Sequence, residues 1–300
     1  IVMASDELKR LIALKRAKPY DPNQSIASLR GTGLDKGSVP REGTEVIACE
    51  ANGVSCEWVT FGTATRETVF IFLHGGGYYR SSAVESRLIA SNLSAACGCR
   101  CFTVEYRLAP ENKFPAAIDD AYTAYRWLLD LGIAAKNIVV GGSSAGGGLT
   151  AALLNKLKQE GYPLPVAAVL LSPWTDLTQS AETYVTNGDP DPAISRGYLN
   201  RAAAGYLGDA DPLDPLASPV NGDLSGLPPL LVQVGKSETM YGDAEAYVQK
   251  AEQADVNVTF QPYDDVIHGW HNSVQIVPNI PETLVAFQKI GEFVRRHVIG

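Results

Sequence analysis

A serine flanked by small residues is the feature of this 300-residue chain best suited to covalent chemistry. It lies in Gly142-Ser143-Ser144-Ala145-Gly146, and only the frame centred on Ser144 fits the pattern G-x-S-x-G. An apolar run precedes this pattern and a helical pattern follows it, which predicts a strand, a sharp turn and a helix. A serine at the apex of such a turn presents its hydroxyl to solvent, and small neighbours let strand and helix pack closely. Ser144 is therefore the candidate nucleophile.

A serine hydroxyl needs a base to remove its proton, and histidine is the side chain that titrates nearest neutrality. The chain has four histidines. His74 precedes a glycine run and His297 lies in an expected terminal helix, so neither suits the role. His268 follows the last expected strand at its carboxyl end, the edge on which Ser144 must also project, and a glycine after it allows a close approach. We prefer His268 as the base over its neighbour His271.

A carboxylate must fix the tautomer of the histidine and stabilise its charged form. With a nucleophile on this kind of strand, turn and helix, the acid lies between serine and histidine in the chain. Glu238 comes just beyond an expected strand, whereas Asp243 stands at the start of the following helix, where acidic residues are favoured for other reasons. Asp265 is too near His268 in sequence to turn back on it. We prefer Glu238 as the acid and keep Asp243 as the rival.

Ester hydrolysis passes through a tetrahedral oxyanion that needs N–H donors already in place. The run His74-Gly75-Gly76-Gly77 follows an apolar stretch and offers bare backbone that can approach a substrate oxygen closely. We assign the oxyanion hole to the N–H groups of Gly76, Gly77 and Ala145. A phosphate-binding loop is the alternative, but neither a Gly-Lys-Ser/Thr sequence nor a G-x-G-x-x-G with a ribose-binding acid accompanies the run.

Expected strands and helices alternate through most of the chain, which predicts a mostly parallel sheet. An amphipathic helix is expected over 6–18, and Asn52-Gly53 between 45–48 and 56–61 indicates an antiparallel hairpin at one edge of the sheet. The further expected strands are 69–73, 101–104, 138–143, 166–171, 230–234 and 256–263. The further expected helices are 84–96, 116–131, 145–158, 195–206, 243–253 and 282–297.

Residues 176–228 depart from this alternation, because they are polar and proline-rich with one helical stretch. An irregular loop of about 50 residues is improbable in a compact core. We interpret this segment, with the N-terminal helix, as a cap over the carboxyl ends of the strands, where open α/β sheets bind ligands. Residues 19–40 show no periodicity and are interpreted as a connector. The expected units are 1–40 as the N-terminal part of the cap, 41–175 and 229–300 as the catalytic core, and 176–228 as the cap insertion.

The composition limits the partners. A net charge of −8 argues against nucleic acid and anionic membranes, which attract basic surfaces, so a small-molecule substrate is expected. No stretch reaches the roughly 18–20 apolar residues that span a bilayer, and residues 1–18 lack the features of a signal peptide, so a cytoplasmic location is expected. The five cysteines match no metal-ligand spacing and are interpreted as buried apolar residues.

Taken together, these motifs resemble those of the hormone-sensitive-lipase-like carboxylesterases, a bacterial family of α/β-hydrolases with an HGGG motif. The matching stretches, in the order of the family, are 74–77, 106–111, 142–147, 172–176 and 268–269. The resemblance implies an α/β-hydrolase fold, with an eight-stranded, mostly parallel sheet flanked by helices and a small helical cap. It also implies esterase activity on short acyl chains without a cofactor or metal, and a structural role for His74 in positioning the glycine loop.

Two positions depart from the family pattern. Ser143 stands where Asp often precedes the nucleophile, and this position lies outside the triad. The stretch 238–243, Glu-Thr-Met-Tyr-Gly-Asp, stands where a D-P-L-x-D pattern is usual. This second departure leaves the choice between the two acids open, although glutamate resembles the acid of some members.

The sequence therefore predicts a serine carboxylesterase that works through Ser144, His268 and Glu238. A ligand-binding receptor on the same fold is the alternative outside enzymes, and the presence of His268 favours catalysis. Amidases, thioesterases, lactonases and lipases would use the same groups. Aromatic side chains beside the nucleophile are expected to wall the pocket, namely Tyr78, Tyr79, Trp174 and Tyr198. By analogy with the family, a homodimer is expected through 256–263 and 282–297.

Overall fold

The computed structural model describes residues 4–19, 21, 24–31, 38–188 and 191–298. Its centre is an eight-stranded sheet in the order β1-β2-β4-β3-β5-β6-β7-β8, in which β2 alone runs against its neighbours. The strands are β1 (Thr44–Ala51), β2 (Val54–Phe61), β3 (Thr65–Leu73), β4 (Cys99–Val104), β5 (Ile138–Ser143), β6 (Ala167–Leu171), β7 (Leu230–Gly235) and β8 (Val258–Tyr263). The expectation of an eight-stranded, mostly parallel sheet is thus confirmed.

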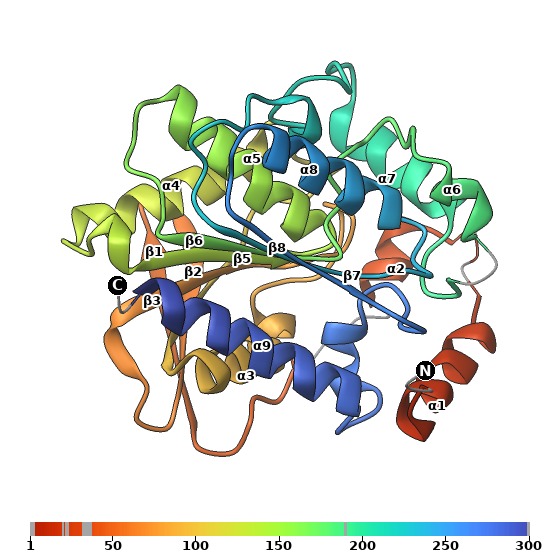
Figure 1. Ribbon diagram of the computed structural model, residues 1–300, viewed down its shortest axis with the longest axis horizontal. Coiled ribbons are helices and arrows are strands. Elements are labelled where there is room, and N and C mark those ends of the chain that lie inside the picture. Colours follow the sequence, from red (N-terminus) through yellow and green to blue (C-terminus); the bar gives the residue numbers. More distant parts are fainter. Residues whose placement is uncertain (1–3, 20, 22–23, 32–37, 189–190, 299–300) are drawn as a thin grey trace.

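Helices cover both faces of this sheet, as Figure 1 shows. Two of them, α3 (Arg87–Cys97) and α9 (Pro281–Val298), pack together on one face. The other face carries α4 (Ala116–Asp130), α5 (Ala145–Gln159) and α8 (Tyr241–Gln253). Because both faces are covered, the central strands are apolar or small throughout rather than alternating, and every residue of β5 and β6 is buried.

The chain turns sharply between β5 and α5, and Ser144 stands at the turn. Its backbone has φ 58° and ψ −120°, a conformation that costs on the order of 1–3 kcal/mol for a residue with a side chain. The Ser144 N–H donates to the carbonyl of Leu171 at 2.8 Å. The Ser144 carbonyl accepts from the N–H groups of Gly148 and Trp174, both at 3.0 Å. These bonds hold the serine in its strained conformation at the end of the strand.

Glycines make the close packing around this turn possible. A Cβ on Gly146 would lie 2.0 Å from the carbonyl oxygen of Leu73 in β3, and a Cβ on Gly148 would lie 2.0 Å from that of Trp174. Both distances are far inside van der Waals contact. The first turn of α5 therefore lies directly on neighbouring backbone, and a side chain at either position would push it away.

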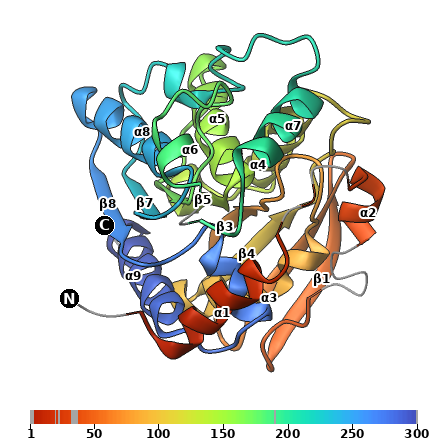
Figure 2. The same ribbon diagram turned by 90° about the vertical axis from the view of Figure 1, so that its right-hand side faces the viewer.

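Four further helices lie on the right-hand side of Figure 1, which faces the viewer in Figure 2. They are α1 (Asp6–Arg16), α2 (Ile26–Gly31), α6 (Thr183–Thr186) and α7 (Arg196–Leu207). Leu8 and Leu11 of α1 are buried against Val266, Ile267 and Trp270, in the segment that follows β8. The N-terminal helix is thereby fixed next to the loop that carries His268. None of the described helices is long and apolar enough to cross a membrane.

The connector expected over 19–40 is wrong in one part, because residues 26–31 form α2. A helix this short shows no periodicity in sequence, and its position depends on contacts with distant residues. Leu29 is buried, and the Arg30 Nε donates to the carbonyl of Tyr79 at 2.7 Å. The rest of that stretch at 20, 22–23 and 32–37 lies outside the described residues.

Gly148→Ala is expected to lower the free energy of unfolding by more than ~2 kcal/mol, because its Cβ would overlap the carbonyl of Trp174. Gly205→Ala is the matched control. Gly205 lies in α7 with no heavy atom within 4 Å of its Cβ position, so alanine there is expected to stabilise by up to ~1 kcal/mol through helix propensity. Urea unfolding measures both, and equal stability of the two variants would contradict this account of the turn.

Candidate active site

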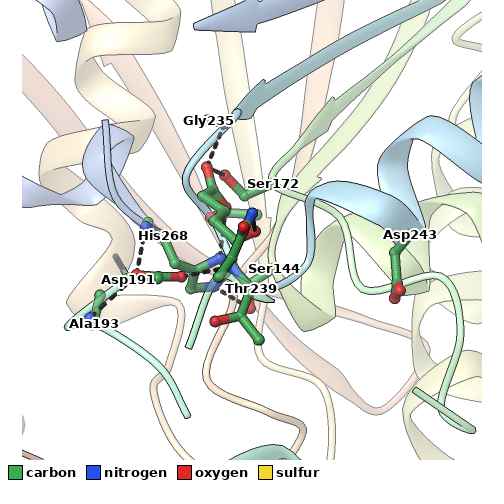
Figure 3. A network of polar contacts seen from close by, with 12 residues as sticks. Ser144, Ser172, Asp191, Ala193, Gly235, Thr239, Asp243 and His268 are labelled. Atoms are coloured by element: carbon green, nitrogen blue, oxygen red, sulfur yellow. Dashed lines mark hydrogen bonds and ion pairs between the residues drawn. The ribbon is translucent and has the colours of Figure 1, made fainter. Parts of the chain in front are cut away.

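Ser144, His268 and Glu238 form a continuous chain of hydrogen bonds. Figure 3 shows Ser144 and His268 within this network. The Nε2 atom of His268 lies 2.9 Å from the Ser144 Oγ, and its Nδ1 atom lies 2.9 Å from the Glu238 Oε2. Since a carboxylate accepts and does not donate, Nδ1 carries the proton and Nε2 is left to accept from the serine hydroxyl. The structure therefore brings together the three residues selected from the sequence, each just beyond the carboxyl end of a strand.

The Glu238 carboxylate is fully buried and has a partner on both oxygens. Its Oε1 accepts from the Ser172 hydroxyl at 2.8 Å and from the Gly235 N–H at 2.7 Å, while Oε2 faces His268. A buried carboxylate is tolerated when its oxygens are satisfied in this way. These bonds fix the plane of the carboxylate and aim one oxygen at the imidazole.

Asp243, the rival acid, lies in the first turn of α8 and makes other contacts. Its Oδ2 accepts from the Tyr184 hydroxyl at 2.8 Å and from the Asp176 N–H at 3.1 Å. Burial raises the pKa of Asp243 well above its ordinary value. In Figure 3 it stands apart from the network around His268. Its contacts join the helix to the segment after β6 and do not reach the imidazole.

His271 and His74 are both buried away from the Ser144 hydroxyl. The His271 Nε2 lies 3.0 Å from the Gln233 Oε1, and desolvation lowers the His271 pKa to about 3. The His74 Nδ1 lies 2.8 Å from the Gly75 carbonyl, and its ring stacks on Tyr106 with 4.0 Å between centroids. Burial lowers the His74 pKa to about 4. Both imidazoles are neutral near pH 7, and His74 supports the glycine loop from behind.

The glycine loop reaches the cavity in a conformation that side chains rarely adopt. Gly76 has φ 108° and Gly77 has φ 64°. A Cβ on Gly76 would lie 2.3 Å from the Arg80 carbonyl oxygen. Within the part of the chain that the structure describes, no residue accepts a hydrogen bond from the N–H of Gly76 or Gly77. Two backbone donors are thus left for a ligand beside Ser144.

Ser144, His268 and the glycine loop line one cavity of about 390 Å³. Of the four aromatic residues expected in its wall, Tyr198 is there. Tyr78, Tyr79 and Trp174 do not line it and are buried in the core instead. Tyr78, for example, stacks on Tyr206 with 3.8 Å between ring centroids. The expectation was wrong for these three because each ring packs against another aromatic ring instead of facing the cavity.

The model of a family described as having the alpha/beta hydrolase fold matches residues 70–272. This chain belongs to the α/β-hydrolase family. It is 40% identical to an acetyl-hydrolase of Streptomyces hygroscopicus over 241 residues, which are 80% of this chain and 79% of that protein. It is 36% identical to an esterase of Acinetobacter venetianus over 242 residues, 80% of this chain and 78% of that protein.

Solved structures indicate a narrower group within the α/β-hydrolases. A crystal structure of an esterase from the bacterial hormone-sensitive lipase family superposes with a TM-score of 0.92 at 39% identity, covering 99% of this chain and 100% of the other. An esterase/lipase from an uncultured bacterium gives 0.93 at 34% identity, with 99% and 100% covered. The resemblance to hormone-sensitive-lipase-like esterases is confirmed, and the protein is a hydrolase with esterase relatives. In the described residues of this hydrolase, no group of three or more His, Cys, Asp or Glu could hold a metal ion.

One acid of the hydrolase site was missed by the sequence analysis. Asp191 is 1% exposed, and its carboxylate accepts from the N–H of His268 at 3.2 Å and of Thr239 at 3.0 Å, as Figure 3 shows. Burial raises the Asp191 pKa to about 6. It ties the loop that carries His268 to the loop that carries Glu238. No sequence pattern marks such a residue, because its partners are backbone groups that any residue supplies.

His271→Gln is expected to weaken the dependence of stability on pH in acid. The folded protein keeps His271 neutral down to about pH 3, whereas the unfolded chain protonates it below about pH 6.5, so folding loses about 1.4 kcal/mol per pH unit between these values. Because glutamine does not titrate, the variant does not lose this free energy of unfolding as the pH falls. Urea unfolding between pH 6 and 4.5 measures the slope, and His74→Gln is expected to reduce it in the same way. An unchanged slope in both variants would show that these imidazoles are not kept neutral by burial.

Proposed function

We propose that this protein is a serine carboxylesterase that hydrolyses short-chain acyl esters through Ser144, His268 and Glu238. The observation that carries the proposal is the unbroken hydrogen-bonded chain from Glu238 through His268 to Ser144 at the wall of a cavity. The same arrangement of alcohol, imidazole and carboxylate activates serine in hydrolases of unrelated folds.

In the first half of the reaction, the Ser144 Oγ attacks the ester carbonyl while the Nε2 of His268 takes its proton. Glu238 stabilises the imidazolium that forms. The negative charge on the carbonyl oxygen falls to the N–H groups of Gly76, Gly77 and Ala145, and each such donor is worth roughly 3–4 kcal/mol in other hydrolases. The imidazolium then gives its proton to the leaving alcohol, and an acyl-enzyme remains on Ser144.

In the second half, water enters where the alcohol left. His268 removes a proton from the water, the hydroxyl attacks the acyl carbonyl, and the same N–H groups hold the second oxyanion. Return of the proton to the Ser144 Oγ releases the carboxylic acid. The protein's own groups supply every proton transfer in this sequence.

Two observations support a short acyl group. A cavity of about 390 Å³ lies at the small end of the roughly 300–1,000 Å³ of ligand pockets in proteins. The relative from Streptomyces hygroscopicus is named an acetyl-hydrolase. We further propose that residues 1–40 and 176–228 act as the cap of this site, since Lys15, Leu29 and Tyr198 from these segments line the cavity.

A homodimer and a cytoplasmic location stay predictions. The dimer would use the segment of β8, which is an edge strand of the sheet, together with α9. Leu284 and Val285 of α9 are 50% and 45% exposed, which suits a surface that a second copy covers. Sedimentation of the purified protein at several concentrations would measure the oligomeric state.

Ser144→Ala is expected to lower kcat for p-nitrophenyl acetate by ~10⁴-fold or more, because the three residues act as a unit. A series of p-nitrophenyl esters from two to twelve acyl carbons measured on the wild-type protein tests the substrate class. Activity that falls beyond short chains supports the proposal. Full activity of Ser144→Ala would refute the assignment, and a wild-type protein that binds but never cleaves these esters would favour the receptor.

Glu238→Gln and Asp243→Asn form a matched pair that separates the two acids. Each replaces a buried carboxylate by its amide, but Glu238 alone of the two contacts His268. Glu238→Gln is expected to lower kcat by ~10³- to 10⁴-fold through loss of the correct tautomer. Asp243→Asn is expected to keep kcat within tenfold of wild type. Initial rates with p-nitrophenyl acetate measure both, and the reverse order would make Asp243 the acid.

A further inference from the structure

Two positively charged side chains line the same cavity as the nucleophile. Lys15 comes from the last turn of α1, and Arg80 follows the glycine loop. Neither has a place in the reaction derived above. The cavity also holds a third cation, Arg30, and among the described residues that line it Glu85 is the only carboxylate. The wall facing the substrate is therefore positively charged, in a protein whose net charge is −8.

Arg30 is already neutralised, which separates it from the other two. Its guanidinium donates to both carboxylate oxygens of Glu111, at 2.9 and 2.7 Å, and to the carbonyls of Tyr79 and Ala109, at 2.7 and 2.6 Å. Such a bidentate pair leaves little of the guanidinium for a ligand. Arg30 is part of the wall and is not a free cation.

No acid among the described residues forms an ion pair with Arg80 or Lys15, and Glu85 acts on Arg80 only through its charge. The Arg80 Nε donates to the Tyr198 hydroxyl at 3.0 Å, and the guanidinium carbon lies 5.3 Å from the Tyr198 ring centroid. Its two terminal nitrogens make no hydrogen bond or ion pair with the described part of the chain. The Lys15 side-chain ammonium makes neither contact with any described residue. The cavity therefore contains two cations whose charge an anionic ligand would neutralise.

The positive charges of Lys15 and Arg80 also repel each other. Burial, and then the positive charge of Arg80, lower the pKa of Lys15, while the charge of Asp191 opposes them. Placing like charges in a partly desolvated cavity costs free energy that an anion would recover. A group in a cleft whose pKa is shifted by burial together with a specific neighbouring charge is a candidate for a functional role.

The backbone segments that carry Lys15 and Arg80 are held in place by the fold. Lys15 extends from a helix whose Leu8 and Leu11 are buried and whose first turn is joined to α9 by two hydrogen bonds from Ser5 to Glu282, at 2.8 and 2.7 Å. The Arg80 backbone N–H donates to the Gly76 carbonyl at 3.2 Å, which fixes the Arg80 backbone to the glycine loop. The ordering that ligand binding requires is therefore confined to the two side chains.

We propose that Lys15 and Arg80 form an anion subsite that selects esters whose acyl or alcohol part carries a carboxylate. The inference rests on the proposed esterase function and narrows its substrate class. The free edge of the Arg80 guanidinium matches the two oxygens of a carboxylate, and Lys15 adds a point charge. The ester carbonyl would lie on Ser144 while the carboxylate lies on this wall of the same cavity.

The test compares substrates in which an amide replaces the carboxylate. One pair, 4-acetoxybenzoate and 4-acetoxybenzamide, places the charge on the alcohol side. The other pair, monoethyl adipate and ethyl adipamate, places it on the acyl side. For each pair, the ratio of kcat/KM for the charged ester to that for the neutral ester is measured in wild type, Lys15→Met and Arg80→Gln. Comparing variants cancels the different intrinsic reactivity of the esters.

In at least one pair, each variant is expected to lower this ratio at least tenfold. Adding 1 M NaCl to the wild-type protein is expected to lower it in the same pair, which gives a readout that needs no substitution. Arg16→Met is the matched control: it removes the same charge from the next position of α1, where the side chain is exposed and does not line the cavity. This control is expected to leave the ratio unchanged.

Binding to a Ser144→Ala background separates this proposal from the esterase itself. Calorimetry there is expected to show tighter binding of the carboxylate ester than of its amide, and loss of that preference in Ser144→Ala/Lys15→Met. If neutral esters are cleaved with dependence on Ser144 but the ratio is the same in wild type, Lys15→Met and Arg80→Gln for both pairs, the anion subsite is refuted and the esterase stands. If no ester is cleaved, the esterase fails, and the binding preference alone decides the subsite.

Discussion

The strained backbone at Ser144 is the constraint around which the site is arranged. The turn is held because α5 lies directly on the backbone of β3 and of the segment after β6, and glycine is the only residue that permits both contacts. Strain of on the order of 1–3 kcal/mol is affordable only in a well-buried core. A fully buried β5 and a helix packed across it supply that core. The serine hydroxyl is exposed to the cavity because everything behind it is close-packed.

The order of the strands in the sheet places the other residues of this hydrogen-bond network next to Ser144. In the sheet order β5-β6-β7-β8, the four strands are followed at their carboxyl ends by Ser144, Ser172, Glu238 and His268. Ser172 donates to Glu238, Glu238 faces His268, and His268 faces Ser144. Parallel strands bring their carboxyl ends to one edge, so four neighbours in the sheet become neighbours in one network. Residues that are distant in the chain are thereby held within hydrogen-bond distance.

The sequence predicts the parts of the site that depend on local pattern. The turn at Ser144 follows from glycines and apolar runs, and His268 and Glu238 follow from their positions after strands. Glu238 and Asp243 both follow β7 and differ in where their side chains point. Glu238 faces His268, whereas Asp243, five residues later in α8, faces Tyr184. Pattern alone does not fix such a direction.

Other residues were missed or misplaced because long-range packing decides them. Tyr78 follows the glycine loop and Trp174 follows β6, but both pack against other rings in the core, with 6.1 Å between their own ring centroids. Asp191 contributes through backbone N–H groups of two distant loops, which leave no trace in residue types. The short helix α2 is fixed by contacts of Leu29 and Arg30 rather than by its own periodicity.

The cavity wall is positively charged, whereas the whole chain carries a net negative charge. The distance between a substrate and each set of charges determines which of the two attracts or repels it more strongly. At physiological ionic strength, screening limits the field of exposed charges to about 8 Å, so the excess of surface acids acts weakly on an anion in solution. Inside the cavity water is scarcer and screening is weaker, and Lys15 and Arg80 act there at short range. The same setting strengthens the interaction of the backbone N–H groups with an oxyanion. Lys15 and Arg80 would therefore attract a charged substrate into the cavity, where the backbone N–H groups remain available to the oxyanion of the transition state.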